Sequence, residues 1–278
     1  ASVRFIGTKG RIEEKLVPQS GYGIDFIKVR PLAGGGLGRK FSGLSSVPLS
    51  VIGAMNLLRK LSPDVVMGVG GYVAGPAVLA GRFMGLQTAL LEQNATIGLA
   101  NRLLKGVVHT AFVSYQCTVD KFSPGRAIFT GNPVKASILE AAKRKQSKGY
   151  DVKSDTVNIL VMGGSQGAKS IDDRVPIALA SAGLRRKVRV LHQGHRDNLP
   201  AVSRAYEAAG IEARVETFIR DTASAFCDAD LVVARSGATT VAELTVMGLP
   251  AVFIPYPHHS DRQQEKNAAP MREAGAAV

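Results

Sequence analysis

The sequence contains no tryptophan, and aromatic residues make up only 6% of its 278 residues. Proteins that bind single-stranded nucleic acid stack bases on aromatic side chains, so this shortage argues against that class. There are two cysteines, Cys117 and Cys227, which are too few and too far apart for a disulfide framework or a cysteine metal site. A reducing compartment is therefore expected.

An apolar run long enough to cross a bilayer is also missing from the most apolar part of the first half. Residues 65–81 are uncharged but number only 17, and glycines and Pro76 interrupt them. A spanning helix needs about 20 consecutive apolar residues. The sequence therefore predicts a strand, a glycine loop and a helix here, and no transmembrane segment.

Acidic residues are scarce in the first half. Residues 1–150 contain 20 Lys and Arg against 7 Asp and Glu, whereas residues 151–278 contain 15 of each, so the net charge of +13 resides in the first half. Such a surface favours an anionic partner, namely nucleic acid, an anionic membrane or a phosphorylated substrate. A basic surface that serves only solubility explains the same charge. Because aromatic side chains are few, no nucleic-acid partner is expected.

Neither end of the chain has a recognisable terminal signal. Residues 2–8 already have the pattern of an interior strand, and residues 274–278 resemble the start of another strand. No signal-peptide pattern opens the chain and no capped helix closes it. We therefore expect a fragment of a longer protein, truncated at both ends.

Short β-branched runs alternate with helical patterns along the chain, which is typical of parallel sheets with right-handed crossovers. The expected strands are residues 3–8, 24–29, 64–69, 88–91, 110–114, 127–130, 157–162, 188–192, 214–218, 231–234 and 251–255. The predicted fold class is α/β, with two Rossmann-like, doubly wound parallel-sheet domains facing a cleft. A basic helix and a polar, turn-rich segment interrupt the alternation, so the domains are expected at residues 1–136 and 156–278, with a linker at 137–155.

Two strand-to-helix junctions in the second half give the strongest functional signal. The strand at 157–162 runs into GGSQGAKS (163–170), and the strand at 231–234 runs into RSGATTVAE (235–243). Such junctions place helix N-termini at the carboxyl ends of strands, where free N–H groups and the helix dipole favour phosphate. Two of them in one domain indicate a site for a nucleoside diphosphate.

Each junction also has a competing interpretation. GGSQGAKS nearly matches a P-loop, but Ala168 stands where that pattern requires glycine, so an NTP-binding module is a rival. In the second junction, Glu243 is suited to accept hydrogen bonds from both ribose hydroxyls. However, Thr240 and Glu243 together also fit a capping box, in which the carboxylate serves only the helix start.

The loop PYPHHSDRQQEKNA (255–268) invites a metal interpretation, because it contains His258, His259 and Asp261. Adjacent histidines point apart, however, and no third imidazole or cysteine is placed to complete a site. No metal and no cofactor are therefore predicted.

Several segments in this order resemble the MurG family of UDP-N-acetylglucosamine:N-acetylmuramyl-(pentapeptide) pyrophosphoryl-undecaprenol N-acetylglucosamine transferases. They are GGYVAGP, EQN, GNPV, GGSQGA, FIRD, RSGATTVAE and GLPAVFIPYPHHSDRQQ, followed by Asn267, and they span nearly the whole chain. The resemblance implies the GT-B fold and transfer of N-acetylglucosamine from UDP-GlcNAc to the C4 hydroxyl of the muramyl sugar of lipid I. The product is lipid II, formed with inversion at the anomeric carbon. The implied process is peptidoglycan synthesis, with its roles in cell shape and division.

The resemblance also implies residues that bind the substrates. Asn94 contacts the donor sugar, Ser165 the diphosphate, and Ile219 the uracil through its backbone. Gln263 and Gln264 approach the sugar hydroxyls. The residues implied to line the diphosphate and ribose, with the carboxylate on the ribose, are Ala238, Thr239, Thr240, Val241, Ala242 and Glu243.

Two departures from the family pattern matter. Lys135 follows GNPV where the family commonly has arginine, which keeps the charge but loses the bidentate fork, so its phosphate role is weaker. The family's proposed catalytic-base histidine lies in a glycine-rich N-terminal loop that no segment here matches. No catalytic residue is therefore assigned, and this piece alone is expected to be inactive.

The implied partners are UDP-N-acetylglucosamine, lipid I and an anionic membrane surface, with the protein peripheral at the cytoplasmic face of the bacterial inner membrane. The alternatives are another GT-B enzyme acting on a UDP-sugar, such as an epimerase or a glycolipid synthase, and an NTP-binding module with a basic nucleic-acid surface.

Overall fold

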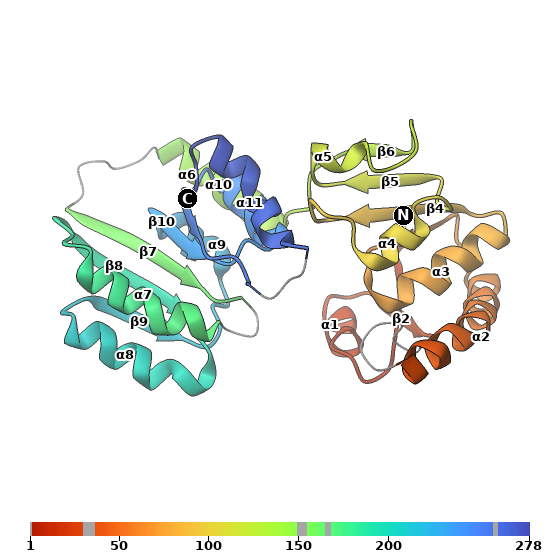
Figure 1. Ribbon diagram of the computed structural model, residues 1–278, viewed down its shortest axis with the longest axis horizontal. Coiled ribbons are helices and arrows are strands. Elements are labelled where there is room, and N and C mark those ends of the chain that lie inside the picture. Colours follow the sequence, from red (N-terminus) through yellow and green to blue (C-terminus); the bar gives the residue numbers. More distant parts are fainter. Residues whose placement is uncertain (1, 30–36, 149–154, 165–167, 258–260) are drawn as a thin grey trace. The chain divides into compact units, whose positions relative to one another are not determined.

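A computed structural model of the chain describes residues 2–29, 37–148, 155–164, 168–257 and 261–278, without the side chains of residues 37–46 and 148. The chain divides into two compact units, Ala1–Gly131 and Asn132–Val278 (Figure 1). Every strand pair in the described part is parallel. The predicted α/β class with parallel sheets is confirmed.

The first unit contains a two-stranded sheet, β1-β2, and a four-stranded sheet in the order β3-β4-β5-β6. Its strands are β1 (Arg4–Gly7), β2 (Gly23–Phe26), β3 (Val65–Gly68), β4 (Gln87–Glu92), β5 (Thr110–Val113) and β6 (Ala127–Phe129). Its helices are α1 (Glu13–Gln19), α2 (Leu37–Leu61), α3 (Gly71–Phe83), α4 (Leu99–Leu104) and α5 (Gln116–Val119). Parallel neighbours need crossover connections, and a helix joins each paired couple of strands here.

Helix α2 divides its apolar residues between the core and the surface. Val51, Ala54 and Leu58 recur at helical spacing and are buried in the core of the first unit. Leu49 and Ile52 on the same helix are exposed. The apolar residues between positions 47 and 58 therefore supply both a core face and an exposed apolar surface.

Gly81 lets α3 lie close against the four-stranded sheet. A Cβ atom at this position would come within 2.9 Å of Cγ2 of Val66, whereas nothing lies within 4 Å of the corresponding point at Gly75 in the same helix. Protein interiors are close-packed, so a side chain at position 81 forces α3 or β3 to shift.

The second unit contains one five-stranded sheet in the order β11-β10-β7-β8-β9. Its strands are β7 (Thr156–Met162), β8 (Lys187–Gln193), β9 (Glu212–Glu216), β10 (Leu231–Ala234) and β11 (Ala251–Phe253). Its helices are α6 (Ala136–Lys148), α7 (Lys169–Ser181), α8 (Leu199–Ala208), α9 (Thr222–Asp228), α10 (Ala238–Met247) and α11 (Gln263–Glu273), with a 3-10 turn at Arg196–Asn198. This is the doubly wound order, and the strand succession reverses between β7 and β10.

Helices cover both faces of this sheet (Figure 1). α7 and α8 lie on one face, where Val161 and Val190 belong to a buried core. α6, α9 and α10 lie on the other face, where Leu160 and Val232 belong to a second core. Neighbouring residues of β7 thus point to opposite cores, which explains its continuous apolar run.

The division between the units falls before the expected linker. Helix α6 occupies most of residues 137–155, and its Ile138, Ala141 and Ala142 are buried in the core of the second unit. These residues share one helical face at i, i+3 and i+4, while the charged residues between them made the segment look like a solvated linker. In the structure α6 packs as part of the second unit.

The structure contains a strand at each of the eleven expected positions. The clearest shift is at β9, expected at 214–218 and observed at Glu212–Glu216. β9 pairs with Arg189–Gln193 at the edge of the sheet, and Phe218 beyond it is exposed. Edge strands often carry charged side chains, so apolar residues alone do not show where such a strand begins and ends.

Candidate functional site

Two strand-to-helix junctions of the second unit lie side by side at one rim of its sheet. β7 and β10 are paired parallel neighbours, with Met162 opposite Ala234 at their carboxyl ends. The segments that lead to α7 and α10 therefore leave the sheet next to each other, where the strand succession reverses. In doubly wound sheets, ligands bind at this point.

Neither helix at this rim has an N-cap residue with a capping side chain. The N-cap residues are Ala168 for α7 and Gly237 for α10, and neither provides a capping hydrogen bond from a side chain. The first N–H groups of a helix have no intrahelical partner, so two adjacent helix starts present donors to an anion. Because α10 begins at Ala238, Thr240 lies inside the helix, and the capping-box interpretation of Glu243 is wrong.

Glu243 is a buried carboxylic acid on α10, with 8% of its surface exposed. Burial raises its pKa, and the positive charge of Lys135 opposes this rise without cancelling it. Lys135 directly precedes α6, so the fold brings two of the predicted substrate-binding residues close together from distant segments. Helical side chains lean towards the N-terminus of their helix, which turns the carboxylate towards the rim.

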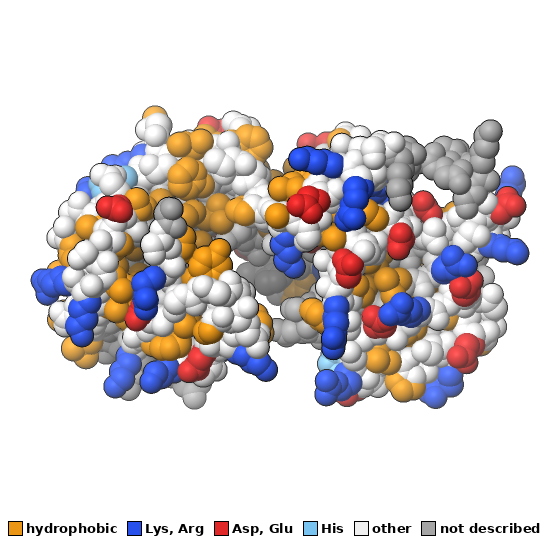
Figure 2. All heavy atoms as spheres, turned by 180° about the vertical axis from the view of Figure 1, so that it is seen from behind, with side chains coloured by type: hydrophobic (Ala, Val, Ile, Leu, Met, Phe, Trp, Pro, Cys, Tyr) orange, Lys and Arg blue, Asp and Glu red, His pale blue; other side chains and the backbone are white. Residues whose placement is uncertain are grey.

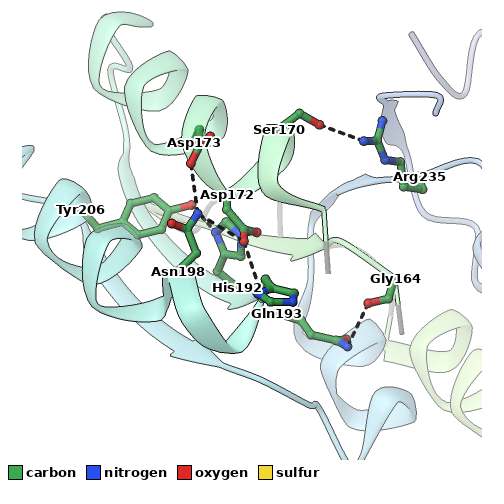
Figure 3. Close-up of polar contacts among 10 residues, drawn as sticks. Gly164, Ser170, Asp172, Asp173, His192, Gln193, Asn198, Tyr206 and Arg235 are labelled. Atoms are coloured by element: carbon green, nitrogen blue, oxygen red, sulfur yellow. Dashed lines mark hydrogen bonds and ion pairs between the residues drawn. The ribbon is translucent and has the colours of Figure 1, made fainter. Parts of the chain in front are cut away.

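Arg235, directly after β10, connects three segments at this rim, and Figure 3 shows its contact with Ser170. Its guanidinium donates to the carbonyl oxygens of Ile254 and Pro255 at 2.7 Å each, and to Oγ of Ser170 at 2.8 Å. It also lies over the ring of Tyr256, 5.6 Å from the centroid. Arg235 therefore fixes the first turn of α7 and the segment after β11 relative to β10, and it adds positive charge to the rim.

The start of α11 is tied to the same rim by two side-chain amides. Oε1 of Gln264 accepts a hydrogen bond from the backbone N–H of Tyr256 at 2.8 Å. Nδ2 of Asn267 donates to the carbonyl oxygen of Ser236 at 3.2 Å. These contacts place the predicted sugar-binding glutamines, Gln263 and Gln264, beside the turn that leads into α10.

Ile219, which the resemblance places at the uracil, lies between β9 and α9, and its side chain is buried. An open hollow of about 510 Å³ adjoins it, lined also by Arg214, Glu216, Phe218 and Asp221. The hollow provides room beside the predicted base-binding position.

Asn94 belongs to the first unit and follows β4. The buried carboxylate of Glu92 accepts hydrogen bonds from the backbone N–H groups of Asn94 at 3.0 Å and Gly98 at 2.9 Å, and from Nδ2 of Asn101 at 2.9 Å. This network fixes the loop that carries Asn94 at the carboxyl end of a strand, where ligands bind in such sheets.

Some predicted residues are not described. Ser165, expected at the diphosphate, and the two loop histidines, His258 and His259, lie outside the described residues. Within the described part, no group of three or more His, Cys, Asp and Glu side chains is placed to hold a metal ion. Among the described residues, no helix is long and apolar enough to span a bilayer.

Sequence reasoning did not single out Arg235 or a buried polar cluster formed by Asp172, His192 and Tyr206 (Figure 3). An arginine directly after an apolar strand was a usable signal for the first. A histidine within the apolar pattern of β8 was a weaker signal for the second, because its partners lie on two other helices.

Comparisons with known proteins identify relatives over nearly the whole chain. Residues 1–113 match the glycosyltransferase family 28 N-terminal domain, and residues 158–278 match the glycosyltransferase family 28 C-terminal domain. The UDP-N-acetylglucosamine--N-acetylmuramyl-(pentapeptide) pyrophosphoryl-undecaprenol N-acetylglucosamine transferase of Myxococcus xanthus is 38% identical over 99% of this chain and 71% of its own length.

Solved structures agree with these relatives. The crystal structure of Acinetobacter baumannii MurG superposes with a TM-score of 0.79 at 31% identity, over 99% of this chain and 75% of that one. A UDP-GlcNAc 2-epimerase of Neisseria meningitidis, solved with UDP-GlcNAc bound, has a TM-score of 0.59 at 11% identity, over 98% of this chain and 83% of that one. At that identity the second likeness concerns the fold alone.

Proposed function

Because the chain belongs to the MurG family of glycosyltransferase family 28, we infer that it transfers N-acetylglucosamine from UDP-N-acetylglucosamine to lipid I. The acceptor is the C4 hydroxyl of the muramyl sugar, and the product is lipid II of peptidoglycan synthesis. The alternatives drawn from the sequence, a UDP-sugar epimerase, a glycolipid synthase and a P-loop module, are not favoured by these relatives.

We propose that the second unit binds the UDP part of the donor, and one observation supports this above the others. Two helix starts, those of α7 and α10, adjoin the paired carboxyl ends of β7 and β10, and their N-cap residues Ala168 and Gly237 have no capping side chain. A diphosphate at this rim would accept hydrogen bonds from both helix starts and would be favoured by both helix dipoles.

The individual roles are those that the resemblance to the family implies. We propose that the residues from Ala238 to Ala242 line the diphosphate and that the carboxylate of Glu243 accepts from the ribose hydroxyls. Ile219 would hold uracil through its backbone beside the hollow that adjoins it. Gln263 and Gln264 would approach the sugar hydroxyls, and Ser165 the diphosphate.

Catalysis would follow from orientation and electrostatics. The chemistry requires that the acceptor hydroxyl attack the anomeric carbon opposite the departing UDP, which gives inversion without a covalent intermediate. The departing diphosphate gains charge, and the two helix starts, together with Lys135 and Arg235, would stabilise it. Asn94, on the first unit, would contact the donor sugar. No residue of this chain is assigned as the base.

We further propose that the first unit faces lipid I and an anionic bilayer at the cytoplasmic side of the bacterial inner membrane, and that nucleic acid is not a partner. Residues 1–131, which form this unit, contain 15 Lys and Arg against 6 Asp and Glu, and this excess of positive charge supports the proposal. Lys and Arg side chains also dominate the charged surface of this unit on the face in Figure 2, at left, whereas both signs mix over the second unit. Each cation near an anionic leaflet contributes about 1 kcal/mol. The proposed process includes the maintenance of cell shape and cell division.

Calorimetry on the 278-residue chain tests the donor site. We expect UDP and UDP-N-acetylglucosamine to bind in the presence of EDTA, because backbone donors and fixed cations supply the positive charge. ADP, which shares the diphosphate, is the control and should bind at least tenfold more weakly, since it lacks uracil. Equal affinity for ADP, or binding of ATP that requires magnesium, would contradict the proposal.

A further inference from the structure

Three side chains form a continuous buried chain of hydrogen bonds behind the rim of the second unit (Figure 3). The hydroxyl of Tyr206 on α8 lies 3.0 Å from Nδ1 of His192 on β8, and Nε2 of His192 lies 3.2 Å from Oδ1 of Asp172 on α7. All three residues are at most 1% exposed. We call Asp172, His192 and Tyr206 the brace.

Burial fixes the protonation state of the brace. It raises the pKa of Tyr206, which therefore remains a phenol and donates to Nδ1 of His192. Burial also lowers the pKa of His192, against the opposing effect of the Asp172 carboxylate. His192 is thus a neutral imidazole whose Nε2–H donates to Asp172. Asp172 and Tyr206 are the titratable groups that face it, one from each helix packed against β8.

The second oxygen of Asp172 holds the segment that follows β8. Oδ2 accepts a hydrogen bond from the backbone N–H of His195 at 2.9 Å and from Nδ2 of Asn198 at 3.5 Å. Gly194 allows this approach, because a Cβ there would meet Oδ1 of Asp172 at 3.3 Å. One carboxylate therefore joins the first turns of α7 to both the end of β8 and the turn beyond it.

The same end of β8 contacts the glycine segment that leaves β7. The backbone N–H of Gly163 donates to the carbonyl oxygen of Gln193 at 3.3 Å, and Nε2 of Gln193 lies 3.5 Å from the carbonyl oxygen of Gly164. The glycine segment and the start of α7 are thus both fastened to residues 193–195. Their relative position at the rim depends on this shared anchor, together with the hydrogen bond from Arg235 to Ser170 in the first turn of α7.

The placement of the brace argues for a role beyond stability. It lies within a core that is otherwise apolar, including Val175 and Val202. Well-packed apolar residues often stabilise such a position as well as a buried polar network does, whereas a satisfied network fixes one geometry. The geometry that is fixed here is that of the helix start proposed to meet the diphosphate.

We propose that Asp172 is a positioning residue for donor binding, which holds the start of α7 in register with the end of β8 through His192, Tyr206 and the backbone of residue 195. The inference rests on the proposed function of the same rim. Without the brace, α7 keeps its hydrogen bond from Arg235 to Ser170 but loses its ties to β8, so its N–H groups point less precisely towards the diphosphate, while the contacts to uracil and ribose remain.

The test compares UDP with uridine on the folded chain, by calorimetry for UDP and ligand-observed NMR for uridine. Asp172→Ala should weaken UDP by at least tenfold and up to about 100-fold, as small misplacements of binding groups do. Uridine binding should change by less than twofold. Val202→Ala is the matched control, because it opens the same core without removing a hydrogen bond of the brace, and it should leave UDP affinity unchanged.

Asp172→Asn tests the geometry without the charge. Its amide can donate to Nε2 of His192 while its oxygen still accepts from the N–H of His195, so UDP affinity at pH 8 should lie within about threefold of wild type. Protonation of His192 should disturb the brace, so UDP affinity is expected to fall at acid pH. In Asp172→Asn this fall should occur at lower pH than in wild type, because the carboxylate that favours the imidazolium form of His192 is gone. A role of Asp172 confined to stability would not move the pH of this fall.

The outcomes separate the two proposals. If the wild-type chain fails to bind UDP, the proposed function fails. If wild type binds and folded Asp172→Ala binds UDP equally well, or if Val202→Ala weakens UDP as much, the positioning role is overturned. Should Asp172→Ala not fold, Tyr206→Phe replaces it, since it removes only the hydroxyl. We then expect a severalfold weaker affinity for UDP and an unchanged affinity for uridine. An unchanged UDP affinity would overturn the proposal.

Discussion

Replacing Glu243 with glutamine should weaken nucleotide binding and stabilise the free protein at the same time. The carboxylate is 8% exposed, and burial raises its pKa in spite of Lys135 nearby. If the ribose hydroxyls donate to it, each is a hydrogen bond to a charged group, worth about 1.5–3 kcal/mol. Losing the charge on one such acceptor should weaken UDP by roughly 10-fold to 100-fold, at about 1.4 kcal/mol per tenfold change.

The effect on stability has the opposite sign. A carboxylic acid whose pKa is higher in the folded than in the unfolded state binds protons more readily when folded. Its contribution to stability is complete below the unfolded pKa and is lost as pH rises through the folded pKa. At pH 7 the buried negative charge therefore opposes folding, and a neutral amide of the same shape removes this penalty. Glu243→Gln should melt at a higher temperature than wild type at pH 8 and differ less at pH 4.

Two measurements check this prediction: calorimetric UDP affinity at pH 8, and thermal melting followed by circular dichroism between pH 4 and pH 8. Glu207→Gln, an exposed substitution on α8, is the control and should change neither. A variant that binds UDP like wild type would refute the ribose role. A variant that melts at a lower temperature at pH 8 would refute the account of its charge.

Three further predictions concern other parts of the chain. Arg235→Lys keeps the charge but cannot reach Ser170 and both carbonyl oxygens together. UDP affinity measured by calorimetry should therefore fall by about tenfold, as for the loss of one hydrogen bond to a charged group. An unchanged affinity would contradict the tethering role of Arg235. Burial lowers the pKa of His192 below its ordinary value of 6.5, so below that pH the unfolded chain binds more protons than the folded chain. The free energy of unfolding should therefore decline as pH falls from 6.5, by up to about 1.4 kcal/mol per pH unit. In urea titrations at several pH values, His192→Gln should reduce the dependence of the free energy of unfolding on pH. The same dependence as in wild type would show that other titratable groups cause it. Gly81→Ala should lower the free energy of unfolding of the first unit by about 1–3 kcal/mol, because the added methyl group overpacks against Val66. Gly75→Ala, in open space on the same helix, is the control and should leave that free energy unchanged or raise it in the same titrations.

Local sequence patterns were sufficient for the sheet and for the rim. The run at 157–162 and the run at 231–234 became β7 and β10, and the two junctions that follow them start at adjacent strand ends. The rules for parallel sheets place all carboxyl ends at one rim, so the presence of both junctions at the same rim could be predicted without coordinates. The pairing of β7 with β10, rather than with another strand, required the structure.

Features that depend on long-range packing could not be predicted from the sequence. The composition of α6 suggested a linker, but three of its residues bury one narrow face in a core that α9 and α10 also help to form. Whether Glu243 serves as a helix cap depended on whether α10 begins at residue 238 or at residue 241. The residue at which a helix begins is set by its tertiary packing as well as by its local sequence. The partners of His192 come from two helices that no spacing rule connects with β8.

The central position of β7 has a consequence during protein synthesis. β7, β8 and β9 are consecutive in the chain, so this half of the sheet can assemble as soon as it leaves the ribosome. The contact of Met162 with Ala234 joins residues 72 positions apart and must wait for β10. Closing so long a loop is slow. In the interval the apolar edge of β7 stays unpaired and open to other nascent chains, which makes this edge the place where chaperones would protect the newborn polypeptide.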